Sequence, residues 1–163
     1  MNDRYVQLYM DIAERISKES YAIRKKVGCV IVKNDSIIAY GYNGTPAGWD
    51  NSCEDKLYCD DGDYGEWKEQ TDKLHDEWVS YKLKTKPEVL HAESNAVSKL
   101  CKSNESSKDS IMFCTLAPCL ECAKLIHQAG IKTLYYRSIY RDTSGLDFLR
   151  KGNVDVQQHS ITL

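Results

Sequence analysis

The second half of the sequence alternates short β-type runs with helical runs, and this alternation restricts the fold more than any other feature. Gly130 follows a helical run that begins at Cys119, and a glycine there suits a left-handed helix C-cap, so the helix is expected to end at that position. The patterning predicts strands at 110–116, 131–136 and 154–157, and a further short helix at 146–151. Strands that alternate with helices in this way favour an α/β layered domain with a mixed sheet.

The first half opens with a helical pattern, followed by a hairpin and a glycine-rich loop. Apolar residues recur at helical spacing over 2–20, and β-type runs at 27–33 and 37–42 flank a turn. The loop GYNGTPAG at 41–48 carries three glycines and a proline, so it cannot continue a regular strand. We therefore expect a helix, a β-hairpin and a shaped loop in this order.

A polar insertion is expected at about 49–87, where Asp, Glu and Lys crowd the sequence and aliphatic residues are few. A few aromatic and aliphatic side chains within it can share a helical face, which predicts a helix over 66–83. Regular patterning resumes with a helix predicted at 92–102. With 163 residues and 42% hydrophobic content, the chain is long enough for one sizeable core, so we expect a single domain over 1–163 that includes the insertion.

Charge and cysteine content narrow the classes of partner. The formal net charge is −2, so no overall basic field exists to hold a long nucleic acid. The sequence has neither a basic leader followed by an apolar run nor a stretch of membrane-spanning length, so no membrane partner is expected. The seven cysteines are odd in number and unevenly scattered, which predicts reduced thiols and a cytoplasmic location.

Two short motifs at predicted helix starts carry the chemistry, His91-Ala92-Glu93 and the run PCLEC that ends at Cys122. Each motif alone is weak, because Cys-x-x-Cys also occurs in redox pairs and in structural zinc sites. Together, in this order and with proline before the first cysteine, they match the pattern of zinc-dependent nucleobase deaminases. One imidazole and two thiolates leave a fourth tetrahedral position open, which is typical of a catalytic zinc.

The four polar residues of these motifs predict a division of roles. His91, Cys119 and Cys122 would bind one zinc ion per subunit, because two cysteines three apart on the first turn of a helix can direct their sulfurs at one ion. Glu93 is not needed as a ligand, and it would act as general base and then as general acid for a zinc-activated water. A thiol–disulfide oxidoreductase built on Cys-x-x-Cys would leave the first motif unexplained.

Over most of its length the sequence resembles the deoxycytidylate (dCMP) deaminases of the zinc-dependent cytidine deaminase superfamily. The segments that carry the resemblance are VGCVIV, GYNGTPAG, HAESNAV, LAPCLECAKLIHQAGIK and YYRSIYRDTSG. It implies a three-layer α/β/α sandwich with a central five-stranded mixed sheet. It also implies hydrolysis of dCMP to dUMP and ammonia, which supplies dUMP for thymidylate synthesis, and a homo-oligomer, usually a hexamer. Family members are typically activated by dCTP with magnesium and inhibited by dTTP, and some viral relatives also deaminate dCTP.

The resemblance implies further site residues. Substrate contacts are expected from Asn43, Ala92, Tyr140 and Lys26, with Asn43 directed to the sugar, and a regulatory nucleotide site is expected at Gly41, Tyr42 and Gly44. Charge alone does not choose among the cations that could hold the substrate phosphate, which are Arg24, Lys25, Lys26, Arg137 and Arg141.

A second, structural zinc occurs in some relatives, and the available ligands here are Cys53, Cys59 and His75. Cys53-x5-Cys59 is loose spacing for such a site, and Ala22 stands where a zinc-bearing relative places a cysteine, so we expect the second site to be incomplete. Two alternatives to a dCMP deaminase stay open. One is a deaminase of the same superfamily that acts on another nucleoside or base. The other is an inactive, zinc-stabilised nucleotide-binding protein, against which the retained Glu93 speaks.

Overall fold

The computed structural model describes residues 1–58, 70–74 and 77–160. Its main element is a five-stranded sheet in the order β2-β1-β6-β7-β8. In this sheet β1 pairs antiparallel with β2 and β6, whereas β6, β7 and β8 run parallel, so the sheet is mixed as predicted. The strands are β1 (Gly28–Lys33), β2 (Ser36–Tyr42), β6 (Ile111–Leu116), β7 (Thr133–Ser138) and β8 (Asp155–Gln158).

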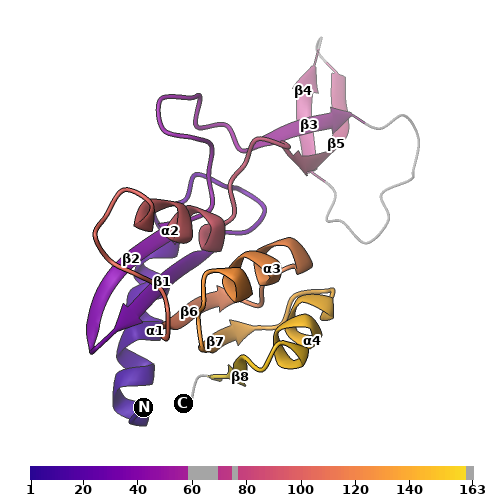
Figure 1. The fold of residues 1–163 in the computed structure, drawn as a ribbon. Coiled ribbons are helices and arrows are strands. Elements are labelled where there is room, and N and C mark those ends of the chain that lie inside the picture. Colours follow the sequence, from indigo (N-terminus) through magenta and orange to yellow (C-terminus); the bar gives the residue numbers. More distant parts are fainter. Residues whose placement is uncertain (59–69, 75–76, 161–163) are drawn as a thin grey trace.

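Helices cover both faces of this sheet and make three layers (Figure 1). One face is covered by α1 (Asp3–Ser17), and the other by α2 (Ala92–Leu100), α3 (Leu120–Gln128) and α4 (Ser144–Lys151). The expected α/β/α sandwich is therefore confirmed. Among the described residues, no helix is both long enough and apolar enough to span a bilayer.

The core divides between the two faces because successive strand residues point to opposite sides of a sheet. Val30, Phe113 and Tyr135 lie in one cross-strand row and pack with the buried side chains of α1. The neighbouring row of Ile31, Met112 and Leu134 packs on the other side with residues of α2, α3 and α4. The central strands are thus buried on both faces, which fixes the helices that carry the candidate site.

The predicted elements of the body are found with ends displaced by a few residues. The helix expected over 2–20 is α1, and the side chain of Asn2 accepts a hydrogen bond from the backbone N–H of Arg4 at 3.0 Å, which caps it. Gly130 has φ +72°, as expected of a residue that ends α3 in the left-handed conformation.

The helix predicted over 66–83 is wrong for residues 70–74 and 77–83, which form strands, and the rest of that range lies outside the described residues. The described part of the insertion forms an antiparallel sheet in the order β3-β5-β4, made of β3 (Glu54–Tyr58), β4 (Gln70–Leu74) and β5 (Glu77–Thr85). The run VSYKLKT alternates larger apolar or aromatic residues with Ser and Lys, and this period of two indicates a strand. This sheet, here called the arm, projects from the body beyond α2 (Figure 1).

Gly41 of β2 lies against α2, and we expect its replacement by alanine to destabilise the fold. An added Cβ would stand 2.3 Å from the carbonyl oxygen of Ala92 and 2.6 Å from the backbone nitrogen of Ala96. Helix α2 would have to move away, at about 1–3 kcal/mol, as is usual for an overpacked core. Chemical denaturation should show this loss for Gly41→Ala. Gly44→Ala is the matched control, since its added Cβ would stand 4.0 Å from the Tyr42 ring, which is an ordinary van der Waals distance.

Candidate active site

Helices α2 and α3 are in contact, and the residues at their N-termini form the candidate site (Figure 1). Strand β6 ends at Leu116, and three residues later Cys119 is the N-cap of α3. His91 is the N-cap of α2. Neither N-cap side chain caps its own helix, so both side chains are available to the site.

His91, Cys119 and Cys122 form a cluster with the geometry of a zinc site. Their ligand atoms all lie within 4.8 Å of one another. The Nδ1 atom of His91 is 3.5 Å from the Sγ atom of Cys119 and 3.3 Å from the Sγ atom of Cys122. Nitrogen and sulfur ligands around a tetrahedral zinc ion stand about 3.6 Å apart, given bond lengths of about 2.0 and 2.3 Å. The donor set and its spacing therefore fit zinc.

The electrostatics of the cluster favour a bound cation. Hydrogen bonds with Cys122 and His91 lower the pKa of Cys119 to about 3. The contact with Cys119, together with burial, raises the pKa of the Cys122 thiol, and the bond to Cys119 raises the pKa of His91. The lowered pKa of Cys119 favours its thiolate, which is the form of cysteine that binds a metal ion.

Glu93 lies on the first turn of α2 and is only 4% exposed. Burial raises the pKa of its carboxyl group, while its own backbone N–H and the charge of His91 act in the opposite direction. The Cys122 thiol also contacts this carboxyl group. The arrangement places a buried carboxyl group beside His91 and Cys122, shielded from bulk water.

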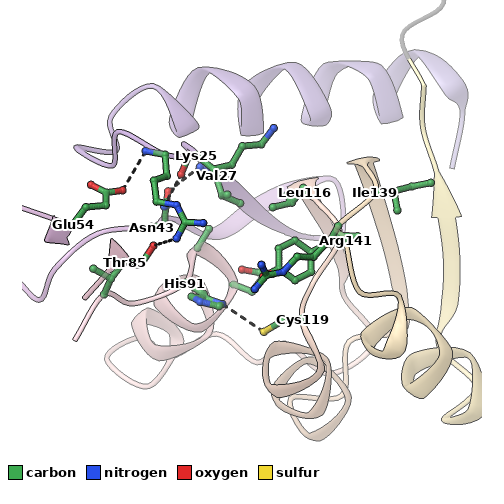
Figure 2. A pocket seen from close by; sticks show the side chains of 16 residues that line it. Lys25, Val27, Asn43, Glu54, Thr85, His91, Leu116, Cys119, Ile139 and Arg141 are labelled. Atoms are coloured by element: carbon green, nitrogen blue, oxygen red, sulfur yellow. Dashed lines mark hydrogen bonds between the residues drawn. The ribbon is translucent and has the colours of Figure 1, made fainter. Parts of the chain in front are cut away.

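A cavity of about 350 Å³ opens onto this cluster (Figure 2). His91, Glu93 and Cys119 line it, and so do three residues predicted as substrate contacts, Asn43, Ala92 and Tyr140. Its exposed cations are Arg24, Lys25 and Arg141. The volume is in the range of small-ligand sites.

Two of the expected phosphate cations are not among the residues that line this cavity. Lys26 is exposed and is not a lining residue, although its neighbour Lys25 is. Arg137 of β7 is buried beneath α1, where its Nε and Nη2 atoms lie 2.8 Å from Glu14 and 3.4 Å from Asp11. Arg137 therefore joins β7 to α1. Arg24, Lys25 and Arg141 line the cavity, and a substrate contact for Lys26 stays a prediction.

The side-chain amide of Asn43 is hydrogen-bonded to the backbone of Lys25 and Val27, which also line the cavity. Its Oδ1 atom accepts the N–H of Val27 at 2.8 Å, and its Nδ2 atom donates to the carbonyl of Lys25 at 2.9 Å. A sugar contact for Asn43 stays a prediction, and bracing of the 25–27 backbone is a role that the sequence did not indicate.

Glu54 and Thr85 of the arm also line the cavity, and the sequence analysis missed both. They occupy a polar segment in which acidic and hydroxyl side chains are common, so nothing in the sequence distinguishes them. They reach the cavity only because the arm folds as a sheet whose β3 and β5 meet at this pair.

The residues considered for a second zinc are described only in part. Cys53 is 2% exposed and packs with Ala22 and Val89 in a small apolar cluster, and burial raises the pKa of its thiol. Cys59 and His75 lie outside the described residues. Within the described part, the only group of three or more potential metal ligands is His91, Cys119 and Cys122.

The three residues expected at a regulatory site have defined places in the fold. Gly41 packs against α2, and the Lys99 ammonium lies 5.8 Å from the ring centroid of Tyr42. Gly44 exchanges backbone hydrogen bonds with Leu90 at 3.1 and 2.9 Å, which fastens the glycine-rich loop to the segment just before His91. A regulatory role for these residues stays a prediction.

Comparison with known proteins identifies the family. Residues 3–138 match the model of the cytidine and deoxycytidylate deaminase zinc-binding region. The deoxycytidylate deaminase of Enterobacteria phage T4 is 36% identical over 171 residues, covering 90% of this chain and 86% of the phage protein. The human deoxycytidylate deaminase is 34% identical over 134 residues, covering 81% of this chain and 64% of the human protein.

A solved structure agrees with these sequence relatives. The dCMP deaminase from the cyanophage S-TIM5, crystallised in complex with dCMP and dUMP, superposes with a TM-score of 0.79 at 41% identity. The alignment covers 98% of this chain and 99% of the cyanophage chain. On the family match, the shared fold and the cluster of one histidine and two cysteines, this chain belongs to the zinc-binding cytidine and deoxycytidylate deaminase family.

Proposed function

We propose that the chain hydrolyses dCMP to dUMP and ammonia at the site formed by His91, Glu93, Cys119 and Cys122. The observation that carries the proposal is the cavity itself, in which a zinc-type cluster and a buried carboxyl group share one space with exposed cations. A nucleoside monophosphate has a neutral base at one end and a phosphate at the other. The zinc-type cluster with its carboxyl group suits the base, and the exposed cations suit the phosphate.

His91, Cys119 and Cys122 would hold zinc, which when bound would lower the pKa of a coordinated water to about 7. Glu93 would accept a proton from the attacking water and pass it to the N3 atom of the cytosine ring. The water oxygen adds to C4 as a hydroxyl, and Glu93 would then carry the proton of this hydroxyl to the amino nitrogen. The bond between C4 and the amino group breaks, and the oxygen stays on C4 as the carbonyl of the product. One water is consumed, and one ammonia is released for each dUMP.

Arg24, Lys25 and Arg141 would bind the 5′-phosphate, and Ala92 and Tyr140 would line the base and sugar. Guanidinium groups suit phosphate because they donate paired hydrogen bonds with fixed geometry. The Arg141 guanidinium lies 5.6 Å from the ring centroid of Tyr140, so the two side chains form one wall.

Replacing Arg141 by alanine is expected to raise KM for dCMP about tenfold, because a hydrogen bond to a charged group contributes about 1.5–3 kcal/mol. The value of kcat should change little, since the phosphate is remote from the reacting carbon. Lys26→Ala is the comparison variant. Its KM, measured by steady-state kinetics, should be close to that of the wild type. A larger effect for Lys26→Ala than for Arg141→Ala would reverse this assignment.

The proposed substrate is tested by ammonia release from dCMP, dCTP and deoxycytidine by zinc-loaded protein. We expect dCMP to be the preferred substrate, since the cavity offers cations for a phosphate. Efficient turnover of deoxycytidine with none of dCMP would contradict the proposal and favour another deaminase of the superfamily.

We also propose, on the sequence resemblance, activation by dCTP with magnesium, inhibition by dTTP, a hexameric assembly and a cytoplasmic location. The resemblance of GYNGTPAG to the nucleotide-binding loop of the family supports the regulatory part. The same kinetic assay, repeated with dCTP or dTTP present, tests it. A rate that neither nucleotide changes would contradict regulation without affecting the proposed reaction.

A further inference from the structure

Two of the cations that line the cavity stand on a segment without regular structure, at 23–27 between α1 and β1. Arg24 and Lys25 are both exposed there. A flexible segment with exposed cations would lose conformational entropy each time it bound a phosphate. Side chains that hold this segment in place therefore bear directly on nucleotide affinity.

Glu54, the first residue of the arm, holds the backbone of this segment. Its Oε1 and Oε2 atoms accept the N–H of Ile23 at 3.1 and 3.2 Å, and Oε1 also accepts the N–H of Arg24 at 3.2 Å. Glu54 is only 8% exposed, and a buried carboxylate is tolerated when it is hydrogen-bonded. Figure 2 shows Glu54 directed at this segment from the side of the arm.

Thr85, the last residue of β5, holds the side chain of the same arginine. Its hydroxyl oxygen accepts a hydrogen bond from the Nη1 atom of Arg24 at 3.1 Å, drawn as a dashed line in Figure 2. Glu54 and Thr85 are directly paired across β3 and β5 at the base of the arm. A single cross-strand pair thus fixes both the backbone and the guanidinium of Arg24.

The other end of the segment is held from the body. Asn43 bonds the N–H of Val27 and the carbonyl of Lys25, as described above, and the Ser20 hydroxyl donates to the carbonyl of Asn43 at 2.7 Å. The segment is therefore fixed at both ends, with Arg24 fastened to the arm and Lys25 next to the brace from Asn43.

We infer that Glu54 and Thr85 are positioning residues that hold Arg24 ready to bind the 5′-phosphate of the nucleotide, which makes the arm a determinant of nucleotide specificity. This inference rests on the proposed function, because it takes the phosphate to lie against Arg24. A guanidinium carries several N–H donors, so it can keep its bond to Thr85 while it binds a phosphate oxygen. Neither positioning residue touches the reacting atoms.

The inference predicts that loss of the positioning residues lowers the affinity only for ligands that carry the phosphate. Glu54→Ala should weaken binding of dUMP about tenfold. Without Glu54, the 23–27 segment must be ordered before Arg24 can bind the phosphate, and this ordering costs binding free energy. Binding of deoxyuridine, which has the same base and sugar without the phosphate, should change less than twofold. Isothermal titration calorimetry on zinc-loaded protein measures both ligands without any need for turnover.

Steady-state kinetics with dCMP supplies a second readout. For Glu54→Ala we expect KM to rise about tenfold with kcat within about twofold of the wild type, since Glu93 and the zinc ligands are unchanged. Glu54→Gln keeps Oε1, which accepts both N–H groups, so this variant should recover most of the affinity. Asp55→Ala is the matched control, because Asp55 is the exposed neighbour whose carboxylate lies 3.9 Å from Lys86.

Thr85→Val tests the inference independently of any folding defect at Glu54, since it removes one exposed hydroxyl and keeps the shape of the side chain. We expect it to weaken dUMP binding about threefold to fivefold, with no effect in an Arg24→Ala background. Glu54→Ala should likewise add little to Arg24→Ala, because residues that act through one group are not additive.

Equal weakening of dUMP and deoxyuridine by Glu54→Ala would overturn the inference, and so would full additivity with Arg24→Ala. No effect of Arg24→Ala on dUMP binding would overturn it as well. The proposed function fails differently, through absence of dUMP formation by the wild type. Because the calorimetric comparison does not depend on turnover, the two failures are distinguishable.

Discussion

Replacing Glu93 by glutamine is expected to lower kcat for dCMP by about 10³-fold or more while zinc stays bound. Glutamine keeps the size of the side chain, but it cannot accept the proton of the attacking water. General acid–base groups raise reaction rates about 10²–10⁴-fold, and Glu93 would act first as the base and then as the acid in the same turnover. Because Glu93 is buried beside the zinc ligands, water is poorly placed to replace it.

The measurement pairs the rate of dUMP formation with the zinc content of the same sample. Glu121→Gln is the matched control, since Glu121 lies on the first turn of α3 between the two cysteines but its side chain is 79% exposed. We expect this control to keep both zinc and activity. A Glu93→Gln protein with an unchanged rate would refute the assigned proton transfer.

Replacing Cys122 by serine is expected to remove both zinc and activity. A hydroxyl stays protonated at neutral pH and is a poor zinc ligand, so the ion would keep only one thiolate and one imidazole. Cys122 is 4% exposed, and apart from Cys119 no other described cysteine belongs to the cluster. We expect dUMP formation to fall by at least about 10³-fold, comparable to loss of the general acid–base group.

Thermal unfolding with and without a chelator provides the second readout for this variant. Zinc that binds only the folded protein stabilises it by about 4 kcal/mol at a thousandfold excess over Kd. The wild type should therefore melt at a lower temperature after chelation, whereas Cys122→Ser should not respond. Cys101→Ser is the control, because Cys101 is exposed and outside the cluster. A zinc-loaded, active Cys122→Ser protein would contradict the metal assignment.

Much of the body could be predicted from the sequence because local and long-range signals agree there. The run 131–136 is rich in aliphatic and aromatic residues, and Gly130 has the backbone angle that its position demands. The strands predicted at 110–116 and 131–136 are found as β6 and β7, whose side chains belong to the two core clusters. The spacing of His91 and Glu93, and of Cys119 and Cys122, translates into geometry because both pairs begin helices. Helix starts are rigid, so sequence spacing fixes distance.

The fold of the insertion and the full lining of the cavity could not be predicted, because they depend on contacts between segments that are distant in the sequence. The helix predicted over 66–83 rested on a few apolar residues at helical spacing. Residues of β5 instead form a strand, which pairs with β3 from a distant part of the chain. Lys26 and Lys25 are adjacent in the sequence, and only the fold of 23–27 decides which one lines the cavity. The contact of Glu54 with Ile23 spans 31 residues, and no local pattern indicates it.

The arm accordingly changes the interpretation of the insertion. In the sequence it is a polar interruption between the hairpin and the first metal motif, whereas in the structure its base touches the cavity through Glu54 and Thr85. In the proposed reaction the chemistry would be carried by residues of α2 and α3, whereas Arg24, one of the proposed phosphate ligands, is held by the arm.

The most direct test of the central proposal is the stoichiometry of dUMP and ammonia formed from dCMP by zinc-loaded protein. We expect the two products in equal amounts, with formation stopped by chelation and restored by added zinc. Absence of dUMP from a folded wild-type protein that contains one zinc ion per chain would contradict the proposal.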